Sequence, residues 1–254
     1  MKLTTLFLAV FFSLAIAIVP TQAQWQDGNL ALKTNGSIFD SGERLRVEII
    51  ALADIPESFY TQVSYSFKVK VLKHIEEEKD GKKTERDEEV EETRTRERKA
   101  GPLLLNMEQH QTQLLDDTWH FGEGLPGRCI TVNVNIFRAY TKQKVATLSS
   151  CVCYEDSTAP ECSTYLRGFK QLHSNTWISF AGQFYADARY SVLFVNDGKV
   201  AQHLQTGIYA NDAKELNISA AEFKLEAKRS YDVLVHDHRT GNSSTLSKVI
   251  IPLN

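Results

Sequence analysis

The sequence has too few prolines and glycines for a fibrous protein, and it has no excess of charge of one sign. Six prolines and thirteen glycines in 254 residues exclude a collagen-like or proline-rich rod. The 29 basic residues nearly balance the 32 acidic ones, so the chain lacks the overall positive charge typical of nucleic-acid-binding proteins. Hydrophobic residues make up 42% of the chain and charged residues 24%, which are globular values and exclude a wholly disordered protein.

Motifs of the common catalytic centres are also missing. The sequence contains no HExxH zinc motif, GxSxG nucleophile elbow, Walker-type phosphate loop or dinucleotide-binding fingerprint. We therefore expect a protein without enzymatic activity and without catalytic, cofactor-binding or metal-binding residues. The alternative is a carbohydrate-active enzyme or its accessory module, with carboxylates contributed by distant strands.

The N-terminal segment has the pattern of a secretory signal peptide over residues 1–23. Lys2 precedes an apolar run from Leu6 to Val19, and the small residues Thr21 and Ala23 stand at the −3 and −1 positions of a cut before Gln24. The run is about 14 residues long, whereas a membrane-spanning helix needs about 20. An uncleaved anchor is the alternative. We expect cleavage, secretion and no membrane span in the mature chain.

Export would place the cysteines in an oxidising compartment, where disulfides form. The four cysteines lie within 34 residues, at Cys129, Cys151, Cys153 and Cys162. Two β-rich runs, 130–137 and 145–152, flank a turn centred near Thr141. This hairpin sets Phe137 opposite Val145 and Cys129 opposite Cys153, which leaves Cys151 for Cys162. The spacing also permits a bond between Cys129 and Cys151. In either case we expect structural disulfides, because one CxC and two single cysteines do not match a four-thiolate zinc site.

Three Asn-x-Ser sequons begin at Asn35, Asn217 and Asn242. In a eukaryotic protein they predict surface positions that carry N-linked glycans, and in a bacterial protein they would have no such meaning.

Alternation of apolar and polar residues dominates the chain, with little helical periodicity. Leu45, Val47 and Ile49 alternate with charged residues, and a longer alternation extends from Val63 to Val71. Gly42, Pro56 and the Gly/Pro-rich residues 122–127 mark turns between such runs. Short strands separated by turns predict an all-β fold of two antiparallel β-sandwich domains.

Two segments resemble known sandwich families. Residues 41–49, SGERLRVEI, resemble the early strand of immunoglobulin-like and macroglobulin-like domains. Further along, Leu225 is followed by Tyr231, by Val233 and Val235 at strand spacing, by a Gly-Asn-Ser-Ser turn at 241–244 and by a strand at 248–252. This pattern resembles the E–F corner and F–G hairpin of fibronectin type III domains, and the resemblance covers about residues 165–254. It implies that the Tyr231 ring packs in the core while its hydroxyl bonds to the corner backbone. Further strands are expected around 177–180, 190–194 and 216–218.

These motifs together predict that the chain consists of four consecutive parts. They are a signal peptide at 1–23, an immunoglobulin- or macroglobulin-like sandwich at 24–154, a linker at 155–163 and a fibronectin type III-like sandwich at 164–254.

A strongly charged insertion, Lys73–Lys99, interrupts the first expected domain. Of its 27 residues, 9 are basic and 11 are acidic, so it cannot supply a core face. Three shapes are open: an extended hairpin turning at Asp80-Gly81, a mobile loop, or a solvated helix with i,i+4 ion pairs. The hairpin sets Glu78 opposite Lys83, and it also sets Glu76 near Glu85, which is unfavourable.

Two roles are open for this insertion. Its acidic part, 85–92, precedes a mainly basic part, 94–99, which predicts a docking arm whose basic end meets an anionic glycan or an extracellular protein. The alternative is a solvated loop without a partner.

The histidine and tryptophan residues offer two weaker site hypotheses. His236 and His238 point to one face of a strand and would share a cation if His203 or Asp212 supplied a third ligand. We expect an exposed strand end instead, because Val233 and Val235 would face the core. Trp119 and Trp177 could stack on a sugar, but in a sandwich we expect them in the core.

These observations predict a secreted, non-enzymatic binding protein that acts through its sandwich surfaces and its charged arm. This inference follows fold analogy. A self-associating matrix or coat component, which would assemble through exposed strand edges, is the alternative among non-enzymes.

Overall fold

The computed structural model shows an all-β protein, as predicted, with no helix among the residues that it describes. It describes residues 29–40, 42–79, 82–98, 103–104, 106–121, 129–154, 165–172, 177–185, 188–209, 214–219, 224–226 and 228–250. The expected signal peptide and the 155–163 linker lie outside these ranges. In this part of the chain, no helix of a length and hydrophobicity suited to crossing a membrane is found.

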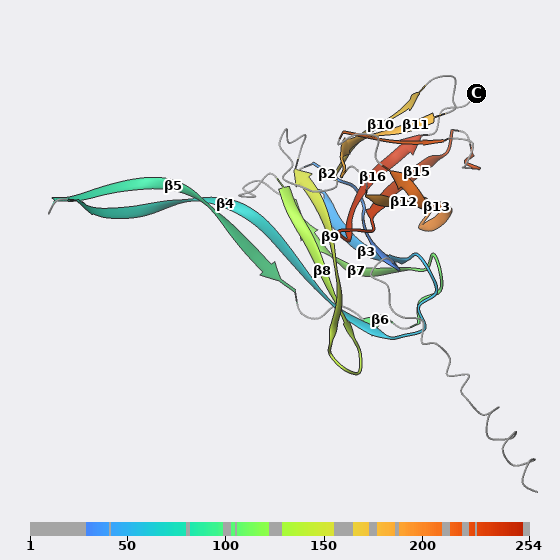
Figure 1. Ribbon diagram of the computed structural model, residues 1–254, viewed down its shortest axis with the longest axis horizontal. Helices are drawn as coiled ribbons and strands as arrows, with labels where there is room; N and C mark the ends of the chain where they lie inside the picture. Colours follow the sequence, from blue (N-terminus) through green and yellow to red (C-terminus); the bar gives the residue numbers. More distant parts are fainter. Residues whose placement is uncertain are drawn as a thin grey trace, which may run out of the picture.

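The strands form three sheets (Figure 1). One contains β1 (Leu30–Thr34), β3 (Arg44–Ala51) and β7 (Thr112–His120). A second contains β10 (Tyr165–Leu172), β11 (Trp177–Gln183) and β14 (Glu215–Ser219). The large third sheet has the order β13 (Lys199–Tyr209), β12 (Arg189–Asn196), β15 (Ser230–Asp237), β16 (Asn242–Ile250), β9 (Lys144–Tyr154), β8 (Cys129–Arg138), β4 (Phe59–Lys79) and β5 (Lys82–Glu97).

Two short strands extend the large sheet, and one of them adds a parallel pairing to it. β2 (Ile38–Phe39) lies parallel to β9, and β6 (Leu103–Leu104) lies antiparallel to β4. β16 also runs parallel to β9, at Asn242 and Ser243. The other strand pairings are antiparallel. We had expected purely antiparallel sheets, whereas the large sheet also contains these two parallel pairings.

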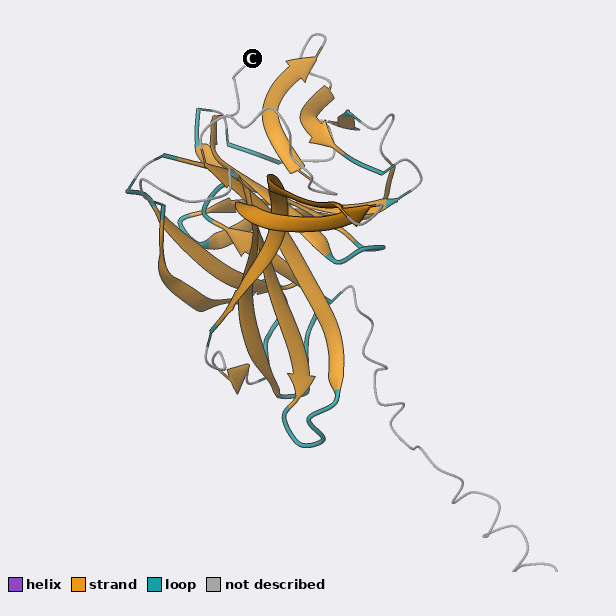
Figure 2. Ribbon diagram, turned by 90° about the vertical axis from the view of Figure 1, so that its left-hand side faces the viewer, coloured by secondary structure: helices purple, strands orange, loops and turns teal. Residues whose placement is uncertain are grey.

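The N-terminal core lies between the β1-β3-β7 sheet and the β9-β8-β4 part of the large sheet (Figure 2). Alternate residues of these strands point into it, as the sequence pattern predicted for 45–49, 63–71 and 130–137. Trp119 belongs to this core and is only 8% exposed, as predicted. The largest buried contributions come from Leu30, Leu32, Phe39, Leu45, Ile49, Phe59, Tyr65 and Phe121.

A C-terminal core lies between the β10-β11-β14 sheet and β12, β15 and β16. Tyr231 is 3% exposed, and its hydroxyl accepts a hydrogen bond from the backbone N–H of Glu226 at 3.0 Å. Leu225 packs against the same core. The interaction implied by the tyrosine-corner pattern is therefore present.

The turn before the last strand lies earlier than predicted. The Asp237 carboxylate accepts hydrogen bonds from the backbone N–H groups of Arg239 at 2.8 Å and Thr240 at 3.4 Å, and the N–H of Gly241 donates to the Asp237 carbonyl at 2.9 Å. An aspartate that bonds to the backbone ahead of it starts a turn. Strand β16 consequently begins at Asn242, so most of the predicted 241–244 turn is strand.

A third apolar cluster joins the two cores, and we call this region the seam. Leu193, Val195 and Leu234 project from β12 and β15, away from the C-terminal core, and pack against Ala31, Ile50 and Leu52. Beside this cluster, Lys33 is 5% exposed and lies 2.9 Å from Glu48 and 3.6 Å from Asp232. Strands β12 and β15 are thus buried on both faces.

Candidate functional site

The charged segment forms a two-stranded ribbon that extends beyond the other strands (Figure 1, cyan β4 and green β5). Strand β8 pairs with β4 only from Phe59 to Phe67, whereas β5 stays paired with β4 as far as Lys79. We call residues 68–79 and 82–93 the arm. At about 3.3 Å per residue, the arm reaches about 40 Å beyond the last contact with β8.

Of the three shapes considered for the insertion, the hairpin is the one present. Glu78 pairs with Lys83 and Glu76 with Glu85, in the register that a turn at Asp80-Gly81 predicts. The turn residues themselves lie outside the described ranges. The alternation that begins at Val63 reaches the first part of the arm and ends at Val71, and pairing with β5 continues β4 to Lys79, so that β4 is 21 residues long.

The two faces of the arm differ, because alternate residues of a strand point to opposite sides. One face, which we call the mixed face, continues the row of side chains that enters the N-terminal core and carries Val69, Val71, Ile75 and Val90. Val69 is only 3% exposed. The other face, which we call the acidic face, carries Glu76, Glu85, Asp87, Glu89 and Glu91 around the 75% exposed Leu72.

Ion pairs link the two strands of the arm, and all of them are solvent-exposed. Such pairs contribute about 0–1 kcal/mol each and weaken with salt, so they tune the ribbon more than they hold it. Lys73 donates a hydrogen bond to Glu92, which lowers the pKa of that carboxyl group below its usual value. The closest contacts are Lys73–Glu92 at 2.7 Å, His74–Asp87 at 2.9 Å, Arg86–Glu77 at 3.1 Å, Lys70–Glu89 at 3.3 Å and Lys68–Glu91 at 3.5 Å.

The basic end of the insertion lies at the root of the arm and contacts the body of the protein. The Arg96 guanidinium lies 5.6 Å from the centre of the Trp119 ring, and Arg98 Nε lies 3.3 Å from Asp116 Oδ2. The Tyr65 hydroxyl also donates to Asp116, and burial together with this carboxylate raises the pKa of Tyr65. Arg96 remains exposed despite its contact with Trp119, so it stays accessible to an anion, as does Arg94.

Four histidines gather at the edge of the seam, where we had expected an exposed strand end. His236 is fully buried and His238 is half-buried, which corrects that prediction. The physical reason is the seam: residues that point away from Val233 and Val235 face the β1–β3 side of the molecule, not solvent. The contacts run from His110 Nε2 to His203 Nδ1 at 3.0 Å, from His203 Nε2 to Ser191 Oγ at 3.4 Å, from Ser191 Oγ to His238 Nε2 at 2.7 Å, and from His236 Nδ1 to Ser243 Oγ at 2.9 Å.

Burial dominates the protonation of this cluster. It lowers the pKa of His203 to about 4 and of His236 to about 3, with smaller contributions from neighbouring histidines. Burial also lowers the pKa values of His110 and His238. The cluster is therefore neutral at pH 7, and its charged form would be strongly disfavoured.

The histidines do not form a metal-binding group in the described part of the chain. His203 lies beside His238 through Ser191, as the cation hypothesis required, but no three ring nitrogens converge. Asp212 lies outside the described residues. Elsewhere, His74, Glu76 and Glu85 have ligand atoms within 4.8 Å of one another, all on exposed side chains.

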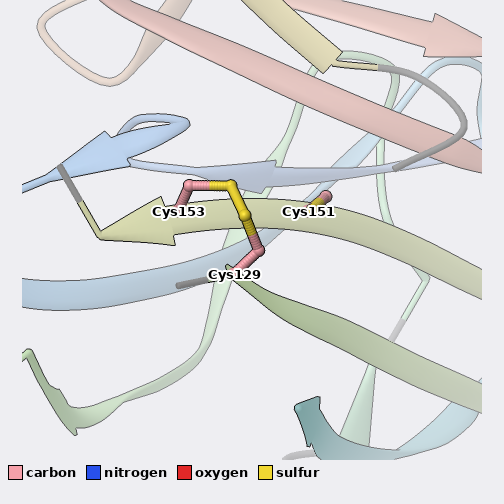
Figure 3. Close-up of side chains that lie close together, drawn as sticks. All are labelled: Cys129, Cys151 and Cys153. Atoms are coloured by element: carbon pink, nitrogen blue, oxygen red, sulfur yellow. A yellow bond between two sulfur atoms is a disulfide. The ribbon is translucent and has the colours of Figure 1, made fainter. Parts of the chain in front are cut away.

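Three of the cysteines lie together at the end of the β8–β9 hairpin (Figure 3). Cys129 is opposite Cys153, and these two form a disulfide. Cys129 therefore does not pair with Cys151, and no described cysteine is a free thiol. Cys162 lies outside the described residues, so its bond with Cys151 stays a prediction. The predicted register holds from Cys129 to Ile136, but a bulge beyond Ile136 sets Phe137 opposite Lys144 and not Val145.

The three sequon asparagines are half-buried rather than fully exposed. Asn35 uses its side-chain amide within the fold: Nδ2 donates to the Arg44 carbonyl at 2.9 Å, and Oδ1 accepts from the Arg46 N–H at 2.7 Å. Asn217 lies on β14 and Asn242 begins β16. Glycosylation at these positions stays a prediction, as does a sugar-stacking or core role for Trp177, whose side chain lies outside the described residues.

Sequence reasoning named His203 as a possible third ligand but did not predict strand β13, which carries it. His203 lies on this strand, which is joined to β12 by a turn at Asp197-Gly198 with φ angles of 49° and 75°. Asp-Gly is the same turn signal that located the arm, so β13 was within reach of the pattern. Ser191, at the centre of the histidine contacts, had no comparable signal.

Comparison with known proteins adds no family. No protein-family model matches the chain, and no curated protein matches it. Among solved structures, Spo0M, a sporulation control protein from Bacillus subtilis, is 10% identical with a TM-score of 0.26, over 84% of this chain and 80% of that one. The Salmonella enterica SafA pilin in complex with the SafB chaperone is 10% identical with a TM-score of 0.22, over 87% of this chain and 96% of that one. Similarities this low carry no argument about function.

Proposed function

We propose that this protein is a secreted, non-enzymatic binding protein whose recognition element is the arm. The proposal includes two β-sandwich domains, an immunoglobulin- or macroglobulin-like one at 24–154 and a fibronectin type III-like one at 164–254. The observation that carries it is the ribbon of charged residues that leaves the N-terminal core and, beyond Phe67, is paired with no other described strand (Figure 1).

The seam supports a rigid mounting for this arm. The apolar seam cluster, the ion pair between buried Lys33 and Asp232, and the β16–β9 pairing all join the two cores. A binding element on a rigid body loses less entropy on association than one on a flexible linker. The root of the arm is also fixed, because Trp119 and Asp116 hold Arg96 and Arg98.

We propose an anionic glycan or an extracellular protein as the partner. Arg94 and Arg96 are exposed and stand on one face of β5, opposite Phe67 and Tyr65. Arginines that line one face of a strand present their guanidinium groups side by side to sulfate or carboxylate groups. The acidic outer arm would then keep the same partner from sliding outward.

The glycan arm of the proposal is tested with heparin as the probe. We expect the intact protein to be retained on immobilised heparin and the double variant Arg94→Ser/Arg96→Ser to elute at clearly lower salt. The matched control is Lys199→Ser/Lys214→Ser, which removes two exposed cations from the C-terminal part of the chain. Equal elution of the two double variants would mean that only net charge matters and would refute an anion site at the root.

The role of the whole arm is tested with a shortened variant. Replacing residues 70–91 by Asn-Gly joins Val69 to Glu92, which are opposite each other, through a favoured two-residue hairpin loop. We expect immobilised intact protein to capture a partner from the protein's native extracellular fluid and the shortened variant to lose it, with an unchanged melting temperature. Capture of the same partner by both proteins would exclude the arm as the recognition element.

A further inference from the structure

The arm has two strand edges with no described partner, because β5 is the last strand of the large sheet and the outer part of β4 lies beyond the end of its pairing with β8. The β4 edge is the one on the β8 side of the ribbon. Strand β4 is flanked by β8 only up to Phe67, and beyond that residue the one described strand paired with it is β5, on its other side. Figure 1 shows the ribbon in profile, with no other described strand alongside its outer part. An open edge of this kind presents N–H and C=O groups to which another strand can pair.

This edge is self-complementary in charge. Its first half carries cations and aliphatic residues, Lys68 to Lys73, and its second half carries three successive glutamates, Glu76 to Glu78. An edge of lysines alone would repel a second copy, which is how many proteins protect open edges. Here an antiparallel second copy sets the cationic half of each chain against the acidic half of the other.

Geometry limits the possible registers. The backbone N–H and C=O groups of every second residue of a strand point to the same edge, and in an antiparallel pair two opposite residues either exchange both hydrogen bonds or exchange none. When two copies of one strand pair through the same edge, opposite residues are therefore both odd-numbered or both even-numbered, and their numbers have an even sum. Centring the two-fold axis on Lys73 satisfies this condition. It sets Lys70 opposite Glu76, Val71 opposite Ile75 and Leu72 opposite His74, each of them twice. The same register sets Lys68 opposite Glu78.

We propose that the partner of the β4 edge is a second copy of this chain, paired antiparallel about Lys73 to form a four-stranded sheet in the order β5-β4-β4-β5. This inference rests on the proposed role of the arm as a recognition element, and it assigns a partner to the edge of the arm. The root, with its exposed arginines, stays available for another ligand.

Two features of the isolated arm favour this pairing. Glu76 faces Glu85 across the ribbon and has no cationic partner among the described residues, so a lysine from a second copy would relieve a like-charge contact. Leu72 is 75% exposed on the acidic face and would be covered in part by its neighbours in the second copy. One contact opposes the pairing: Lys73 meets Lys73 on the axis.

Sedimentation velocity of the purified protein tests the proposal at concentrations between about 1 and 200 µM, where small transient interfaces associate. We expect the intact protein to form a dimer that weakens as salt is added. Lys70→Glu sets Glu against Glu76, and Glu76→Lys sets Lys against Lys70, so each variant alone is expected to self-associate at least about tenfold more weakly. Both residues are exposed, so the melting temperature should not change.

Mixing the two variants gives the decisive result. An equimolar mixture restores every Lys–Glu pair between unlike chains, so we expect a heterodimer as strong as the intact dimer. Lys73→Thr removes the one like-charge contact and is expected to tighten self-association. A monomeric intact protein, or variants that dimerise as well alone as when mixed, would overturn the proposal. If the protein stays monomeric but still captures a foreign partner through the arm, self-association is refuted and the proposed function of the arm is supported.

Discussion

The buried histidine cluster predicts that the protein loses stability in mild acid. Burial lowers the pKa of His203 from 6.5 to about 4 and that of His236 from 6.5 to about 3. Well above pH 6.5 these residues are neutral in both the folded and the unfolded chain, so they do not affect the pH dependence. Below it, the unfolded chain binds protons that the folded chain does not, and the free energy of unfolding falls until the folded pKa is reached.

The expected size of the effect follows from the shifts. pH 5 lies 1.5 pH units below the unfolded pKa of 6.5, so the shift of the fully buried His236 costs about 2 kcal/mol there, at about 1.36 kcal/mol per pH unit. His203 is only partly buried, so solvent screening makes its cost smaller. The two together cost about 2–4 kcal/mol between pH 7.5 and pH 5, a large share of the roughly 5–15 kcal/mol that stabilises a typical domain. The lowered pKa values of His110 and His238 act in the same direction.

Urea unfolding at a series of pH values between 7.5 and 5 measures this loss. His236→Asn keeps a polar atom near the position of Nδ1, which bonds to Ser243, but cannot take up a proton. We expect this variant to be less stable at pH 7.5 but to lose about 2 kcal/mol less than the intact protein on going to pH 5. His120→Gln, at an exposed position, is the matched control. The same pH dependence in the intact protein and in His236→Asn would refute the reasoning.

Two further predictions concern the joint between the cores and the C-terminal corner. Gly241 and Gly198 have similar φ angles, +71° and +75°, but a Cβ at Gly241 would lie 2.8 Å from the Thr147 carbonyl oxygen, whereas a Cβ at Gly198 would meet no atom within 4 Å. In urea unfolding, we therefore expect Gly241→Ala to lower the free energy of unfolding by about 1–2 kcal/mol more than Gly198→Ala does. Equal costs would mean that the β16–β9 approach is not tight. Tyr231→Phe leaves the Glu226 N–H without its acceptor, so we expect thermal unfolding to show a loss of about 1 kcal/mol in stability. Tyr140→Phe, at a 94% exposed position, is the control and should cause no loss. Equal losses in the two variants would mean that the corner hydrogen bond does not stabilise the fold.

Local patterns indicated the arm as one of three open shapes and predicted its register, because the signals that determine a hairpin are local. Alternation gives the strand, and Asp80-Gly81 gives the turn, so together they give the register down to Glu76 opposite Glu85. The unfavourable Glu76–Glu85 pair counted against the hairpin in the sequence, and in the structure it is tolerated on an exposed ribbon. The β8–β9 register and the Cys129–Cys153 bond were predictable for the same reason, up to a bulge that no local signal marks.

The histidine cluster was not predicted, because its environment is set by contacts between distant parts of the chain. Sequence reasoning assigned one buried face to β15 and left the other to solvent. Leu193 and Val195 of β12 and Leu234 of β15 point to that second face, and they make both strands nearly continuous in apolar residues. Runs of this kind are typical of strands that are covered on both sides. The signal for the seam was therefore present, but which residues cover the strands could not be read from the pattern.

The seam and the arm are linked through the large sheet. Strand β4, which carries the arm, and strands β15 and β16, which border the histidine cluster, belong to that one sheet and are connected through β8 and β9. The β16–β9 connection is short, with two residue pairs, and Gly241 lies beside it. His236 bonds to Ser243, a residue of that connection, so charging His236 would act directly beside it. The root of the arm lies two strands further along the sheet, where β8 pairs with β4 from Phe59 to Phe67 and the Cys129–Cys153 bond joins β8 to β9.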